Sequence, residues 1–185
     1  MNNPGRIQIV STKPCTTQSE LALAYTPGVA EPCKAIIKTP DEAYRFTSKG
    51  SLIAAVTNGS AVPGLGNVGP LAAKPYMEAL ASVYKKVADL DLFDIEINSR
   101  DHKLLKKIIL SLQPTFGGIL LSGISAPDCY LLQSALKQEM YTPVILEATG
   151  IAVATVAACL NASKLKSSSL REMHLVCYGN NELKK

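Results

Sequence analysis

The sequence predicts an α/β domain in which a mainly parallel sheet is flanked by helices, preceded by an irregular, partly helical segment. Two patterns carry this prediction. From Ser51 onward, short apolar runs alternate with segments of helical periodicity, and strands that are joined through helices run parallel in one sheet. Before Ser51 the chain is interrupted repeatedly by Pro and Gly, as at Pro27 and Gly28, so regular elements are expected to be short there.

The individual elements follow from periodicity and from helix-start signals. Strands are expected at Ser51–Val56, Phe93–Ile97, Gly118–Leu121, Pro143–Leu146 and Met173–Tyr178. Helices are expected at Gln18–Tyr25, Pro32–Lys38, Lys74–Val87, Asp101–Leu112, Pro127–Met140 and Gly150–Ala162. Pro75 suits the first helical position, where the N–H that proline lacks would be unpaired anyway. Asp94 and Glu96 alternate with apolar residues, which predicts a half-buried strand with a solvated acidic face rather than a metal site.

Length and composition exclude several classes of protein. The 185 residues suffice for one domain with a short appendage but not for a substrate domain plus a cofactor domain. The net charge of +4 is mild, so no nucleic-acid partner is expected. Five cysteines without a C-x-x-C pair indicate neither a disulfide framework nor a zinc site. The longest apolar stretch, Ile151–Leu160, is too short for a bilayer, so we expect a soluble, cytoplasmic protein with no membrane partner.

Three features are candidates for a functional role. Gly64–Gly69 matches G-x-G-x-x-G in letters, but a long loop precedes it and Pro70 follows it, which favours a turn or a ligand-edge loop over a dinucleotide site. Tyr25 lies among turn residues, where it is either a general acid or a tyrosine at the edge of the core. His102 and His174 are isolated from any nucleophile, which favours a solvated or structural role.

Several motifs in register make the sequence similar to one enzyme family. Leu23–Cys33, Gly64–Ala72, Pro114–Gly118 and Ile124–Pro127 resemble the N-terminal domain of bacterial malic enzymes, and the resemblance covers roughly residues 3–178. It implies oxidative decarboxylation of malate to pyruvate with NAD(P) and Mg²⁺ or Mn²⁺. In that chemistry a Lys removes the hydroxyl proton, a Tyr protonates the enol carbon, and the metal ion stabilises the enolate.

The resemblance also implies where the site residues should be. The general acid would be Tyr25, and the substrate-binding loop would contribute Gly64, Gly66 and Asn67. The position of the general base is occupied by Leu80, which cannot accept a proton. Neither Lys74 nor Lys85 lies on the same helical face as position 80.

The metal ligands of the family are also replaced. Two carboxylates are implied at positions where this chain has Ser122 and Gly123, and Glu147 is the only carboxylate in the segment that should supply the third. One carboxylate is a poor site for a divalent cation that needs several oxygen ligands. We therefore expect no bound metal and no cofactor in this chain, and Tyr25 would be a vestigial acid.

The resemblance divides the chain into three parts and leaves several functions open. Residues 1–50 would pack on the domain, residues 51–165 would form the malic-enzyme-like domain, and residues 166–185 would begin a missing NAD(P)-binding domain. A catalytically inactive domain that acts by binding or oligomerisation is the first hypothesis. It would form a homodimer, or a heterodimer with an intact malic enzyme. The alternatives are a subunit or fragment of a malate oxidoreductase and a sensor that binds a small dicarboxylate.

Overall fold

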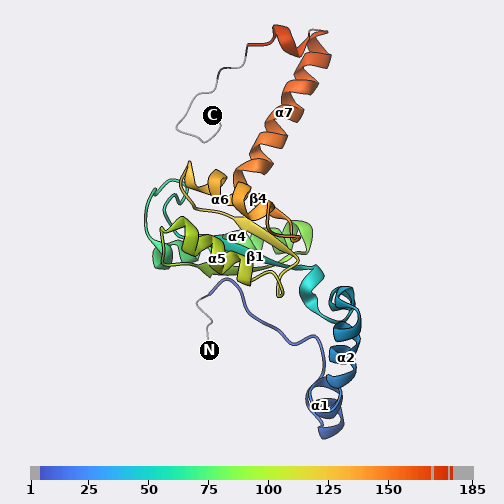
Figure 1. Ribbon diagram of the computed structural model, residues 1–185. Coiled ribbons are helices and arrows are strands. Elements are labelled where there is room, and N and C mark those ends of the chain that lie inside the picture. The colour runs from blue at the N-terminus through green and yellow to red at the C-terminus, as the bar shows by residue number, and fades with distance from the viewer. Residues whose placement is uncertain (1–4, 168, 175, 177–185) are drawn as a thin grey trace.

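A parallel sheet of four strands forms the centre of the computed structural model, which describes residues 5–167, 169–174 and 176 (Figure 1). Its strands are β1 (Leu52–Thr57), β2 (Asp91–Glu96), β3 (Gly118–Leu121) and β4 (Val144–Leu146). They are ordered β2-β1-β3-β4, and every pair is parallel. In this register Val56 lies opposite both Ile95 and Leu121. The predicted fold class is therefore confirmed.

Helices cover both faces of the sheet. They are α4 (Pro70–Ala88), α5 (His102–Ser111) and α6 (Asp128–Lys137). α4 packs on one face through a core of Ala55, Met77, Ala81, Leu92 and Leu120. α5 and α6 pack on the other through a larger core that includes Val56, Leu105, Ile109, Ile119, Leu121, Leu132 and Leu136. Burial of these two apolar faces is the main stabilising contribution to the domain.

The helix α4 begins five residues before Pro75, which was expected to open it. Gly69 has φ +79°, and Pro70 occupies the first turn. A proline in the first turn loses no intrahelical hydrogen bond, whereas Pro75 lies inside the helix. The start at Pro70 adds a full turn before Lys74, the residue at which the helix was expected to begin.

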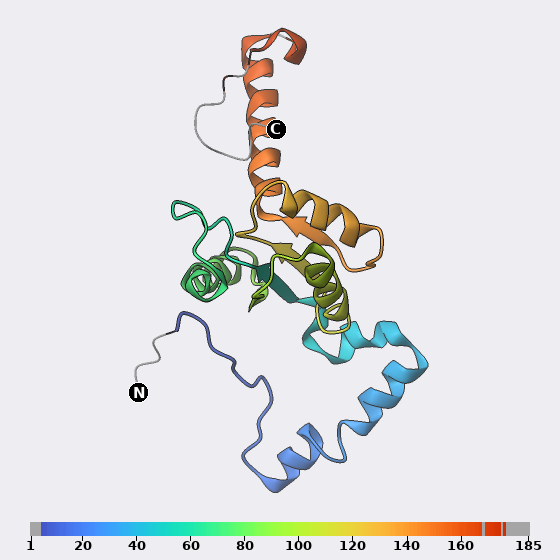
Figure 2. The ribbon, with the colours of Figure 1, turned by 60° about the vertical axis from the view of Figure 1, so that its left-hand side comes forward.

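The N-terminal segment forms an arm that extends from the sheet domain (Figures 1 and 2). It contains α1 (Gln18–Ala24), α2 (Ala30–Lys38), α3 (Ala43–Phe46) and two short 3₁₀ turns at Pro40–Glu42 and Ser48–Gly50. None of its helices has a buried residue. Lys49 ends the arm, and its Nζ donates to the carbonyls of Gln113 and Phe116 at 2.5 and 2.8 Å. This contact fixes the end of the arm to the domain.

The helix α7 (Glu147–Lys166) projects from the domain, and none of its residues is buried (Figure 1). Among the residues that the structure describes, it is the one helix whose length and composition would suit a membrane span, and it is longer than the stretch Ile151–Leu160 noted in the sequence. A single helix of this kind is weak evidence for a span. Half of the strand expected at Met173–Tyr178 falls outside the described residues, and Met173, His174 and Val176 are not in a strand.

Candidate functional site

A cavity of about 980 Å³ opens at the carboxyl ends of β3 and β4. Its walls come from the Gly-rich loop (61–64 and 66), the last residue of β3 with the loop after it (121–124), α6 (129, 130 and 133), and the end of β4 with the first turns of α7 (146–149, 151 and 152). Open parallel sheets generally bind ligands at this edge, because the loops that follow neighbouring strands converge there. The cavity is therefore the candidate ligand site of the domain.

Three polar side chains meet at this edge of the sheet. The Tyr76 hydroxyl donates to Glu147 Oε1 at 2.6 Å, and Ser122 Oγ donates to Glu147 Oε2 at 2.5 Å. Burial, followed by the hydrogen bond to Glu147, raises the pKa of Tyr76 above its ordinary value. The phenol therefore stays protonated and acts as a hydrogen-bond donor. Together the two hydroxyls fix the orientation of the Glu147 carboxylate.

Leu80 lies one helical turn after Tyr76 and one turn before Tyr84, on the same stripe of α4. All three are half-buried and pack against the core on that face of the sheet. Burial, and then the nearby charge of Glu147, raise the pKa of Tyr84 as well. This stripe of α4 therefore offers Glu147 a phenol donor and apolar surface but no proton acceptor.

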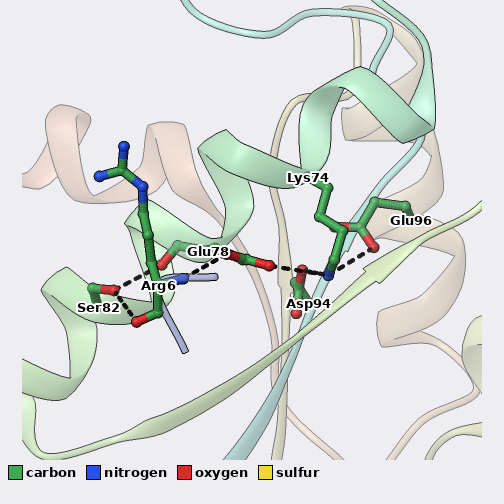
Figure 3. A network of polar contacts seen from close by, with 6 residues as sticks. All are labelled: Arg6, Lys74, Glu78, Ser82, Asp94 and Glu96. Atoms are coloured by element: carbon green, nitrogen blue, oxygen red, sulfur yellow. Dashed lines mark hydrogen bonds and ion pairs between the residues drawn. The ribbon is translucent and has the colours of Figure 1, made fainter. Parts of the chain in front are cut away.

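Neither neighbouring lysine is available as a base. Lys74 Nζ forms an ion pair with Asp94 and also lies 3.6 Å from Glu78 Oε1 and 3.9 Å from Glu96 Oε2 (Figure 3). The hydrogen bond to Asp94 raises the pKa of Lys74. Lys85 Nζ lies within 2.9 Å of two aspartates, and its pKa is also raised, chiefly by the hydrogen bond to Asp89. When the pKa of a lysine is raised, a smaller fraction of its side chain is unprotonated at neutral pH, so less of it is available to accept a proton.

The prediction that β2 has a solvated acidic face is wrong. The Asp94 side chain is only 3% exposed, while the apolar Phe93 is 42% exposed. α4 covers the acidic face of the strand and supplies Lys74 as the counter-charge. The same network reaches the arm, because the backbone N–H of Arg6 donates to Glu78 Oε2 at 2.8 Å (Figure 3).

Glu96 should make stability depend on pH. Burial, followed by the hydrogen bond and charge of Asp94, raises the pKa of Glu96 from 4.5 to about 7. Between these values the folded state holds a proton that the unfolded state has lost, so stability falls as pH rises from about 5 to about 8, by roughly 1–3 kcal/mol. Urea unfolding at both pH values should show this fall.

The matched variant is Glu96→Gln, which resembles the protonated side chain. We expect it to flatten this part of the pH dependence and to be more stable than the unsubstituted protein at about pH 8. The difference between the two proteins isolates the contribution of Glu96 from that of every other group. An unchanged pH profile in the variant would contradict this assignment.

The residues implied by the resemblance do not all gather at the cavity. Gly64 and Gly66 line it, whereas Asn67 is exposed and is not part of the lining. Tyr25 caps the end of α1 with 68% of its surface exposed. In both ribbon views the arm that carries Tyr25 lies on the opposite side of the domain from α7 (Figures 1 and 2).

The sequence reasoning missed Tyr76 as a site residue. Tyr76 precedes Leu80 by four residues, a spacing that places both on one helical face. This spacing could have identified Tyr76, because a residue one helical turn before the implied base position faces the same side of the helix. The contact with Glu147 joins residues 71 positions apart and had no signal in the sequence.

The fold and the cavity define a class of protein, an open parallel-sheet domain with a ligand site at the carboxyl edge of its strands. The chain belongs to the malic enzyme family, because the family model "Malic enzyme, N-terminal domain" matches residues 4–109. The resemblance deduced from the motifs is therefore confirmed.

Individual relatives agree with this assignment. The chain is 44% identical over 177 residues to an NADP-dependent malic enzyme of Haemophilus influenzae and 45% identical to an NAD-dependent malic enzyme of Rhizobium meliloti. Both matches cover 95% of this chain but 23% of the relative, so the chain spans about a quarter of their length. The solved malic enzyme of Pyrococcus horikoshii superposes with a TM-score of 0.86 at 40% identity, over 90% of this chain and 39% of that one.

The expectation of no cofactor is wrong, because the relatives of this chain depend on a dinucleotide. The relatives are named as NADP-dependent and NAD-dependent enzymes, and malic enzymes use a divalent metal with the dinucleotide. The expectation failed because it was drawn from residues that make up only a quarter of the relatives' length.

The residues present here do not fit the divalent ion. Among the residues that the structure describes, no group of three or more His, Cys, Asp or Glu side chains could hold a metal. At the two implied ligand positions, the Ser122 hydroxyl is bonded to Glu147, and Gly123 has φ +62°. A Cβ at Gly123 would lie 2.7 Å from Thr57 Oγ1, so the local backbone is not shaped for an aspartate.

Proposed function

We propose that this malic enzyme N-terminal domain is catalytically inactive and acts through binding or association. The observation that carries the proposal is the apolar Leu80 at the implied base position, one helical turn after Tyr76. The nearby Glu147 carboxylate is already bonded to the hydroxyls of Tyr76 and Ser122. Decarboxylation of malate needs a group that accepts the hydroxyl proton and an ion that stabilises the enolate. Leu80 cannot accept a proton, and Ser122 with Gly123 cannot hold the ion.

Oxaloacetate decarboxylation tests this proposal on the domain itself. This half of the malic enzyme reaction transfers no hydride, so it needs the metal site but no dinucleotide. We expect the protein with Mn²⁺ to release CO₂ from oxaloacetate no faster than Mn²⁺ alone. We also expect no NADH or NADPH from malate. The Haemophilus influenzae relative serves as the positive control. Decarboxylation that is faster than with Mn²⁺ alone, and that elutes together with the chain during purification, would refute inactivity.

The arm supports association as the role of the inactive domain. Its helices bury nothing, and Leu23 and Ile37 are 75% and 82% exposed. Apolar side chains in such numbers on a segment without a core of its own are typical of an interface. We propose that the arm pairs with a second copy of this chain or with the matching domain of an intact malic enzyme.

Self-association should therefore depend on the arm. Sedimentation velocity over a wide concentration range should show a dimer for the unsubstituted chain. Leu23→Glu should shift the equilibrium to the monomer, because a charge placed in an apolar interface is strongly unfavourable. The control is Leu71→Glu, since Leu71 is also largely exposed, at 85%, but lies on α4. A chain that stays monomeric at all concentrations, or equal effects of both variants, would exclude a homodimer built on the arm.

A further inference from the structure

The cavity at the carboxyl edge of the sheet carries a negative charge, which is unusual for a site related to that of an enzyme with a dicarboxylate substrate. Among the residues that the structure describes, no Lys, Arg or His lines it, and Glu147 is its only charged side chain. Most of the remaining wall is apolar, with Val62, Leu121, Ile124 and Ile151 as examples. A dianion placed there would meet a like charge and no cation.

Glu147 is prepared to receive a hydrogen-bond donor. Tyr76 and Ser122 each occupy one lone pair of the carboxylate, and each carboxylate oxygen can accept a second hydrogen bond. The two hydroxyl donors hold the group in one orientation, which reduces the ordering that a ligand would have to impose. A carboxylate framed by low-dielectric walls also attracts cations more strongly than one in open solvent.

We propose that this cavity binds an organic ammonium ion with an apolar body. Its N–H groups would donate to Glu147, and its carbon chain would lie along the apolar wall. The volume of about 980 Å³ is at the upper end of the range usual for small-molecule sites. The inference rests on the proposed function, because it takes the cleft to have lost the metal that would otherwise recruit a dicarboxylate.

The test compares four probes that share size but differ in charge: n-butylammonium, n-butanol, n-butanoate and malate. A ligand that binds only the folded state stabilises it by an amount that grows with the logarithm of the ligand concentration above Kd, so n-butylammonium should raise the melting temperature progressively with concentration. Butanol should have a smaller effect, which measures the apolar contribution alone. Butanoate and malate should have none. A malate or butanoate effect equal to that of n-butylammonium would overturn the proposal.

Variants of the cluster locate the binding site. Glu147→Gln keeps the shape but removes the charge, and we expect calorimetric affinity for n-butylammonium to fall by about tenfold or more, as for loss of a charged hydrogen bond. Ser122→Ala removes one orienting donor and should weaken affinity by a smaller factor. Glu139→Gln is the control, because Glu139 pairs with Lys106 outside the cavity. Affinity that is unchanged in Glu147→Gln and Ser122→Ala would also overturn the proposal.

Assaying oxaloacetate decarboxylation on the same preparations separates the two proposals. Absence of turnover together with absence of ammonium binding removes the ligand inference and leaves the inactive domain standing. Turnover with Mn²⁺ removes the proposed inactivity directly, whatever the binding results are.

Discussion

Replacing Lys74 by Met should lower the free energy of unfolding by about 2–4 kcal/mol. Removing one partner of a buried ion pair typically costs 3–5 kcal/mol, because the remaining charge is left without compensation. Here Asp94 is almost fully buried, but Lys74 is itself 45% exposed, which places the expected loss at the lower part of that range. Three carboxylates, Glu78, Asp94 and Glu96, would lose their common cation (Figure 3).

Lys85→Met is the matched control for this substitution. Lys85 also pairs with two carboxylates and lies on the same helix, but both of its partners, Asp89 and Asp91, are exposed. Exposed pairs contribute little to stability, so urea unfolding of this variant should stay close to the unsubstituted protein. Equal losses in the two lysine variants would show that burial of Asp94 does not determine the effect.

The Lys74 variant should also be partly restored by acid. Without the cation, the carboxyl groups of Asp94 and Glu96 repel each other at neutral pH, and protonation of one removes the repulsion. Its stability should therefore rise more steeply on lowering the pH than that of the unsubstituted protein. A loss that is equal at all pH values would point to lost packing of the lysine chain instead of lost charge.

The sheet could be predicted because its signal is local. The predicted strand at Gly118–Leu121 matches β3 in both bounds, and its four residues are all apolar or Gly, as a strand buried on both faces requires. The acidic face of β2 was mispredicted because alternation shows which residues share a face but not what covers it. That Asp94 is buried depends on Lys74, twenty residues earlier in the chain.

The candidate site divides in the same way. Leu80, Ser122 and Gly123 could be identified from the sequence, because each lies in or beside a segment that resembles a malic enzyme motif. The bond between Tyr76 and Glu147 could not, since it joins the face of α4 to the start of α7 across the edge of the sheet. The exposure of α7 could not be predicted either, because its apolar residues have no preferred side, and a helix that is apolar on all sides is usually buried.

Gly59→Ala should be among the most destabilising single substitutions in the domain. Gly59 has φ +66°, and a Cβ there would lie 2.0 Å from the carbonyl oxygen of Gly69. The Gly59 carbonyl also accepts the N–H groups of Val68 and Gly69 at 3.0 and 3.1 Å, which closes the Gly-rich loop beside the cavity. The left-handed backbone and a clash with main-chain atoms that cannot rotate away together predict a loss of about 3–4 kcal/mol in urea unfolding.

Gly64→Ala separates the two contributions. Gly64 also has a positive φ, +76°, but no atom lies within 4 Å of its hypothetical Cβ. Only the conformational penalty applies there, about 1 kcal/mol. The difference between the variants then measures how tightly the loop is held against the N-terminal end of α4. If Gly59→Ala is no worse than Gly64→Ala, the loop moves freely at its base, and the cavity rim formed by Gly64 and Gly66 is not fixed by the contact of Gly59 with Gly69.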